Sequence, residues 1–121
     1  MADPSELPRR RYPCSECPWR CDTPPGKFPA ERYEALRATS GTRGREAPVG
    51  SPMFACHKSP EGREEACAGW LAAVGYESLT VRLQLAFGRL DPAALTPGDD
   101  WPELFDSYEQ MAATQGSEEP R

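Results

Sequence analysis

Residues 14–21 have the sequence CSECPWRC, and the fold of the whole chain is best approached from this stretch. It contains three of the five cysteines, and two residues separate Cys14 from Cys17. Thiols at this spacing can bind one metal ion or cluster from a single tight turn, and a second pair elsewhere would complete four-coordination. Cys56 and Cys67 supply that pair. The pattern therefore predicts a metal or iron–sulfur site with these four cysteines as ligands.

Four residues close to the predicted ligands have less certain roles. Cys21 is interpreted as an accessory thiol, and His57, the only histidine, as an accessory or substitute ligand, because spacing alone excludes neither. We expect Trp19 and Arg20 to lie beside the site. There an aromatic ring would exclude water and a guanidinium would offset thiolate charge. A Trp that only packs and an Arg that is only solvated is the alternative interpretation.

The spacing of the cysteines does not decide which metal is bound. Zinc takes four sulfur or nitrogen ligands, and its binding adds folding free energy, so it is the first expectation. A 4Fe–4S cluster is the second, because it is larger, tolerates wider spacing and often has a proline after a ligand cysteine, as Pro18 follows Cys17. The third interpretation is that the cysteines are small buried apolar residues without metal. A thioredoxin-like dithiol lacks the βαβ context that it needs.

The composition predicts a small core with much irregular structure. Of 121 residues only 38% are hydrophobic, whereas 14 are proline and 10 are glycine. Small cores commonly need a metal or disulfides for stability. We therefore expect a mostly α, small irregular domain of about four helices, with a cysteine-anchored metal site and long coil segments.

Apolar spacing and turn residues predict the individual elements. The second predicted helix places Cys67 on the apolar face that carries Trp70, Leu71 and Val74, so this thiol should point inward. A short extended run, 53–56, would position Cys56. The predicted helices cover residues 28–40, 63–74, 78–90 and a stretch that begins near 101. The predicted organisation is a disordered tail at 1–12, one domain at 13–114 (a cysteine-bearing half, 13–75, and an acidic helical half, 76–114), and a disordered tail at 115–121.

Charge is distributed unevenly between the two halves. Residues 1–63 carry 11 Lys and Arg against 8 Asp and Glu, and residues 64–121 carry 3 against 11. An acidic helical half favours a protein partner, while a pI of about 4.9 makes nucleic acid the weaker expectation. No run reaches the about 18 apolar residues of a membrane span, and the N-terminus lacks the apolar core of a signal peptide. We therefore expect a cytoplasmic protein with no membrane partner, a compartment in which clustered cysteines favour metal over disulfides.

Four motifs in order resemble a family of small uncharacterised proteins that is common in actinobacteria and their phages. They are CSECPWR at 14–20, FPAERY at 28–33, FACHKS at 54–59 and CAGWL at 67–71. The similarity spans about residues 12–75. It implies that the four predicted ligands, with His57 beside them, recur in the family and that Cys21 departs from its pattern. It implies no settled function.

The sequence therefore supports three functions in order. The first is a small metal-binding interaction or regulatory protein without catalytic activity. The second is an iron–sulfur redox sensor or electron-transfer protein. The third is a metal-dependent enzyme, which would need an open zinc position and a base. The chain offers neither a glycine-rich phosphate loop nor the His-x-Glu arrangement of zinc deaminases.

Overall fold

The computed structural model describes residues 7–26, 28–41, 44–56 and 64–116. Within these ranges the chain forms four short α-helices and no strand, which confirms the mostly α class. The helices are α1 (Ala30–Leu36), α2 (Ala68–Val74), α3 (Leu79–Ala86) and α4 (Tyr108–Gln115). Three 3₁₀ turns accompany them: η1 (Arg37–Thr39), η2 (Gly75–Glu77) and η3 (Pro92–Leu95).

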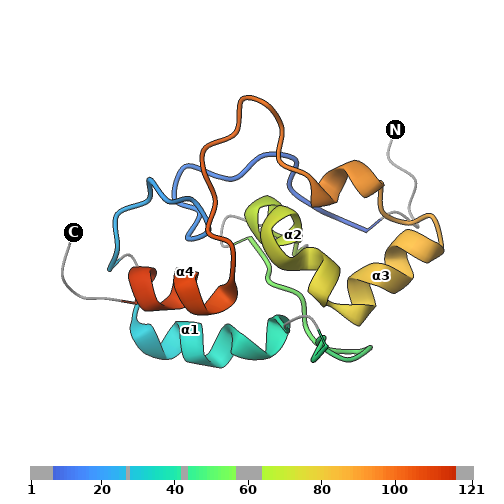
Figure 1. Ribbon diagram of the computed structural model, residues 1–121, viewed down its shortest axis with the longest axis horizontal. Helices are drawn as coiled ribbons and strands as arrows, with labels where there is room; N and C mark the ends of the chain where they lie inside the picture. The colour runs from blue at the N-terminus through green and yellow to red at the C-terminus, as the bar shows by residue number, and fades with distance from the viewer. Residues whose placement is uncertain (1–6, 27, 42–43, 57–63, 117–121) are drawn as a thin grey trace.

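Helix α2 forms the centre of the molecule because its sequence, AGWLAAV, has no charged residue. Trp70 and Leu71 are fully buried, and the core around them includes Trp19, Val81 and Met111 from other segments. Figure 1 shows α2 in the middle, α3 to one side, and α1 beside α4 on the other. The core therefore draws on nearly the whole chain.

Helices α1 and α4 are joined by two polar contacts. The Tyr108 hydroxyl donates a hydrogen bond to the Tyr33 carbonyl, and Arg37 pairs with Glu109. The Ser107 side chain caps α4 by accepting from the N–H of Gln110 at 3.1 Å. These contacts place the C-terminal helix against the segment that follows the first cysteines.

The fourth helix begins later than its apolar spacing predicts. We expected a start near Trp101, but residues 103–105 are extended and pair with the cysteine segment instead. The N–H of Cys21 donates to the Glu103 carbonyl at 2.9 Å, and that of Phe105 donates to the Trp19 carbonyl at 3.0 Å. Backbone groups used in this pairing cannot also form helical hydrogen bonds, so the helix begins only after Ser107.

Three extended segments pair with one another at the N-terminal end of α2. Residues 54–56 pair antiparallel with residues 65–67, and residues 8–10 pair with the other side of Ala66. The described part of the second predicted helix is accordingly extended up to Cys67, which is the N-cap of α2 rather than a residue inside it. Residue 63, at which that predicted helix begins, lies outside the described residues. Residues 7–12, assigned to a tail by the sequence, are hydrogen-bonded here to Ala66 and Arg89.

None of the helices in the described part of the chain has the length and apolarity that a membrane span needs.

Candidate metal centre

The first cysteine pair lies on a tight turn that the backbone closes. The N–H of Cys17 donates to the Cys14 carbonyl at 3.1 Å, and the N–H of Arg20 donates to the Cys17 carbonyl at the same distance. The Thr23 hydroxyl adds a 2.6 Å hydrogen bond to the Cys17 carbonyl. The turn is thereby fixed, with Cys17 fully buried and Cys14 half-buried.

The second pair comes from the two antiparallel segments in front of α2. The N–H of Cys56 donates to the Glu65 carbonyl at 2.8 Å, and the N–H of Cys67 donates to the Phe54 carbonyl at 2.9 Å. Both thiols are buried. Pairing of these segments brings Cys56 and Cys67 to the same place although ten residues separate them in the sequence.

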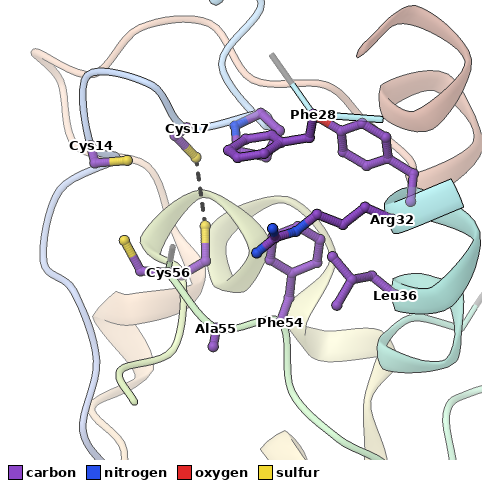
Figure 2. A pocket seen from close by; sticks show the side chains of 11 residues that line it. Cys14, Cys17, Phe28, Arg32, Leu36, Phe54, Ala55 and Cys56 are labelled. Carbon is purple, nitrogen blue, oxygen red and sulfur yellow. Dashed lines mark hydrogen bonds between the residues drawn. The ribbon is translucent and has the colours of Figure 1, made fainter. Parts of the chain in front are cut away.

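All four predicted ligands line one cavity, as Figure 2 shows. The sulfurs of Cys17 and Cys67 lie 3.5 Å apart, at hydrogen-bond distance, and do not form a disulfide. The space open to a water-sized sphere is about 20 Å³, which is room for a single water molecule. The structure therefore unites residues that are as many as 53 positions apart.

The structure does not show an assembled metal site. Among the described residues, no group of three or more Cys, His, Asp or Glu side chains is arranged closely enough to hold an ion. The expectation of a cysteine-anchored metal site is corrected to this extent: the four thiols share a cavity but do not stand at ligand distance.

Of the two accessory candidates, only Cys21 belongs to the described residues. Cys21 is exposed and does not line the cavity. Burial, together with the charges of Glu103 and Asp106, raises the pKa of its thiol. His57 lies outside the described residues.

Two arginines that the sequence analysis did not single out bring positive charge to the thiols. The Nε of Arg10 donates to the sulfur of Cys56 at 3.4 Å, and this contact is the main reason why the pKa of Arg10 is raised. Arg32 lines the cavity, with its guanidinium 5.0 Å from the centre of the Phe28 ring. Both residues occur in the sequence as ordinary members of charged runs, so only the fold reveals their position.

The remaining walls are aromatic. Phe28, Tyr33 and Phe54 line the cavity, and the buried Tyr33 hydroxyl has no hydrogen-bond partner among the described residues. Burial is the main cause that raises the pKa of Tyr33 to about 12; the charge of Arg32 opposes this shift, and the Cys17 sulfur adds to it. A neutral phenol next to a sulfur is therefore available as a hydrogen-bond donor.

The thiols of Cys14 and Cys17 are held in their neutral form in this arrangement. The hydrogen bond with Cys17, followed by burial, raises the pKa of Cys14. For Cys17, the hydrogen bond with Cys14 lowers the pKa, but the Cys67 thiol and burial outweigh it, so the net direction is also upward. Neutral thiols in an apolar cavity are weak nucleophiles, and a cation would be needed to make them thiolates.

Trp19 and Arg20, expected beside the site, support the turn rather than cover the sulfurs. Arg20 donates to the carbonyls of Cys14 and Pro13 at 3.3 and 3.5 Å and pairs with Asp22. Trp19 is fully buried and packs edge-on against Phe54 and Tyr108. These two residues connect the first cysteine turn to the core.

Two further residues hold the turn from outside the predicted site. A Cβ on Gly69 would lie 2.8 Å from the Trp19 Cβ and 3.0 Å from the Cys17 sulfur, so glycine allows α2 to approach. The side-chain amide of Gln115 lies within hydrogen-bond distance of the carbonyls of Pro18, Arg20 and Thr23. A glycine inside a helical apolar pattern is a sequence signal for Gly69, whereas nothing local distinguishes Gln115.

Comparison with known proteins places the chain in a family. A family model described as "Family of unknown function (DUF6283)" matches residues 9–121, so the chain belongs to this family. The match extends beyond the four motifs at 14–71 and includes the acidic helical half. Neither a curated protein nor a solved structure matches the chain.

Proposed function

We propose that this protein is a small zinc-stabilised interaction module without catalytic activity, with Cys14, Cys17, Cys56 and Cys67 as the zinc ligands. The observation that carries the proposal is the convergence of these four thiols on one small cavity in the core. Four cysteines that only filled space would have no reason to gather from three separate segments.

The distance between two of the sulfurs and the size of the cavity favour a single zinc ion over an iron–sulfur cluster. Zinc–sulfur bonds of about 2.3 Å in a tetrahedron put ligand sulfurs about 3.8 Å apart, and the sulfurs of Cys17 and Cys67 are separated by 3.5 Å. A cluster binds each cysteine to a different iron, which requires wider separation and more room than about 20 Å³. Zinc binding would need Cys14 and Cys56 to move inward while their thiols lose protons.

The surroundings suit the charge that such a site would carry. Four thiolates and one Zn²⁺ have a net charge of −2, which is costly in an apolar interior unless nearby cations and donors offset it. Arg10 already donates to Cys56, Arg32 lies at the cavity, and the Tyr33 hydroxyl would find an acceptor in a thiolate. These residues would therefore hold the electron-rich sulfurs of the loaded site.

A site with four protein ligands has no open coordination position, which is the arrangement of structural rather than catalytic zinc. The protein would then act through a partner. The acidic half exposes two aromatic side chains, Tyr76 and Phe87, each about 60% accessible. Exposed aromatic residues favour a protein partner, because aromatic residues are enriched at interfaces.

Metal analysis of protein purified without oxygen tests the proposal. We expect one zinc per chain, a colourless solution, and loss of zinc in both Cys14→Ser and Cys67→Ser. Cys21→Ser is the matched control, since this exposed thiol lies outside the cavity, and it should retain zinc. Iron with sulfide and absorbance near the violet edge of the visible range would instead support the iron–sulfur redox sensor. Wild-type protein without metal would refute the four-ligand site.

A further inference from the structure

A second concave surface lies on the other side of the arginine run from the cysteines. It is a groove of about 390 Å³ between the N-terminal segment, the start of α2, and the η3 region with its following loop. Figure 1 shows the N-terminal segment, in blue, passing near η3 and the orange loop. Arg9, Arg10, Arg11, Thr96 and Trp101 supply its polar and aromatic lining. Its volume is in the range of small-molecule sites.

The arginines are presented by a fixed backbone. The N–H of Arg10 donates to the Ala66 carbonyl at 2.9 Å, the N–H of Ala66 donates to the Pro8 carbonyl at 3.0 Å, and the N–H of Leu7 donates to the Arg89 carbonyl at 2.8 Å. Arg9, Arg10 and Arg11 all line the groove, so three guanidinium groups give this side of it a positive charge, although that of Arg10 also contacts Cys56 and Glu65. A charged group on a fixed backbone loses less entropy when it binds a ligand.

Arg9 also has an unsatisfied donor. Its Nε is buried and has no hydrogen-bond partner among the described residues. A buried guanidinium N–H without an acceptor is costly, and a ligand oxygen would remove that cost once the Arg9 side chain turns Nε toward the groove. Arginine forms its strongest such bonds with planar or tetrahedral oxyanions, carboxylate and phosphate.

The opposite end of the groove is aromatic. Trp101 is half-buried, and its ring meets the edge of Tyr12 with 5.7 Å between centroids. The backbone at Gly98 lies against the indole, where a Cβ would come within 2.8 Å of Nε1. The Tyr12 hydroxyl donates to the Asp100 carbonyl and fastens this turn to the N-terminal segment. An indole held in this way is a platform for a flat ring.

We propose that this groove binds a nucleotide, with its phosphate on Arg9 and Arg11 and its base against Trp101. The orientation follows from charge: the exposed carboxylates of Asp99 and Asp100 flank the tryptophan end and repel phosphate from it. Stacking of a base on an aromatic ring with the phosphate on arginine is the chemistry of nucleotide and single-strand recognition. The inference does not depend on the zinc proposal, because the cavity with the four thiols is a separate space.

Binding of adenosine 5′-monophosphate to the full chain, followed by tryptophan fluorescence, tests the inference. Trp19 and Trp70 are fully buried, so quenching reports mainly on Trp101. We expect adenosine 5′-monophosphate to bind about tenfold or more tightly than adenosine and than inorganic phosphate, since each half of the ligand has its own contact. Equal binding of all three probes would overturn the proposal.

Variants identify the contacts. Arg11→Gln changes an exposed side chain and should weaken nucleotide binding about tenfold through one lost charged contact, with a smaller salt dependence. Arg9→Lys keeps the charge but removes the guanidinium and should weaken binding several-fold. Arg45→Gln, outside the groove, is the matched control. Equal affinities of the Arg11 and Arg45 variants would refute the site, whichever metal the protein contains.

A 5′-phosphorylated thymidine tetranucleotide distinguishes the two sources of the ligand. Tighter binding of the tetranucleotide than of the mononucleotide would assign the groove to a strand end, and the reverse to a free nucleotide. Either result supports the proposal if Arg11→Gln weakens binding of the ligand that binds more tightly. Binding that is insensitive to Arg11→Gln would show nonspecific attraction and would overturn it.

Discussion

The cysteine-bearing half and the acidic helical half are stabilised by different means. In the first half, from residue 13 to 75, the backbone is mostly turn and extended segment, and its buried cysteines meet through contacts between distant residues. In the second half, α3 and α4 each begin at a serine, Ser78 and Ser107, whose side chain caps the first turn. Local signals therefore define the second half, while the first depends on what its side chains bind.

The halves also depend on each other unequally. Residues 103–105 of the acidic half hydrogen-bond to the first cysteine turn, and so does Gln115, which the sequence assigned to the tail but which is the last residue of α4. Helix α4 thus serves as a support for the turn. If the site holds zinc as proposed, removal of the metal should therefore affect the cysteine-bearing half more strongly than α3, although the two halves share one core.

If zinc is bound as proposed, its removal should have the largest effect, and that effect should be greatest in the first half. Structural zinc contributes on the order of 10 kcal/mol in small domains. With a chelator present, we expect amide hydrogen exchange to accelerate strongly at residues 14–23 and 67–74, and far less in α3. Mass spectrometry of exchanged peptides measures both. Uniform acceleration across the chain would show that the halves unfold as one unit, and no change would argue against a structural metal.

Gln115→Leu should have the next largest effect, because it breaks the connection between the halves. Gln115 is 1% exposed, and its amide serves three carbonyls of the cysteine turn at 3.0 to 3.3 Å. Leaving these buried acceptors unsatisfied should cost about 3 kcal/mol of unfolding free energy. Gln110→Leu on the same helix removes a single exposed hydrogen bond, from the Asp106 N–H at 3.0 Å, and serves as the comparison. Denaturant unfolding of both variants makes the comparison, and equal stabilities would show that water satisfies the carbonyls.

Gly69→Ala should destabilise the protein although alanine favours helices. The added Cβ would lie 2.8 Å from the Trp19 Cβ and 3.0 Å from the Cys17 sulfur, and such overpacking costs about 1–3 kcal/mol. Gly75→Ala is the matched control at the end of the same helix, where the Cβ would meet flexible leucine side-chain ends at 3.1 and 3.3 Å. Thermal unfolding of the two variants should therefore differ. A stabilised Gly69→Ala would contradict the close packing of α2 on the turn.

Asp22→Asn should have the smallest effect, and that effect should depend on pH. The hydrogen bond from Arg20 lowers the pKa of Asp22 below its ordinary value of 3.8. Since the folded-state pKa is the lower one, the pair stabilises the fold above the unfolded-state pKa and is lost as pH falls through the folded one. The carboxylate is 56% exposed, so the stabilisation should stay below about 1 kcal/mol. Melting temperatures of variant and wild type should differ slightly at pH 7 and converge below pH 3; a difference that persists in acid would point to a cause other than charge.

The site was partly predictable from the sequence because cysteine chemistry is local and specific. The two-residue spacing of Cys14 and Cys17 indicated a turn that presents both thiols, and the turn exists. Membership of Cys56 and Cys67 in the same cluster was an expectation from ligand counting, and the structure places both at the shared cavity. Their ligand role stays a prediction, since the thiols are not at ligand distance.

The helix boundaries show where sequence reasoning failed. The apolar spacing after Trp101 is helical in period, yet residues 103–105 are extended because the cysteine segment competes for their backbone groups. Likewise, residues 64–66 pair with neighbouring extended segments instead of joining α2. Periodicity reports which side chains can share a face, but it contains no information on a distant backbone that offers a better partner.

By itself the sequence determined the mostly helical class, the small irregular core and the four cysteines that are candidate ligands. These follow from composition, apolar period and ligand spacing, all of which act over a few residues. Only the tertiary structure decided that Arg10 and Arg32 accompany the thiols, that Gln115 holds the turn, and that Arg9 and Trp101 line a second groove. Those relations join residues up to 97 positions apart, and they arise because burial of α2 folds every other segment around it.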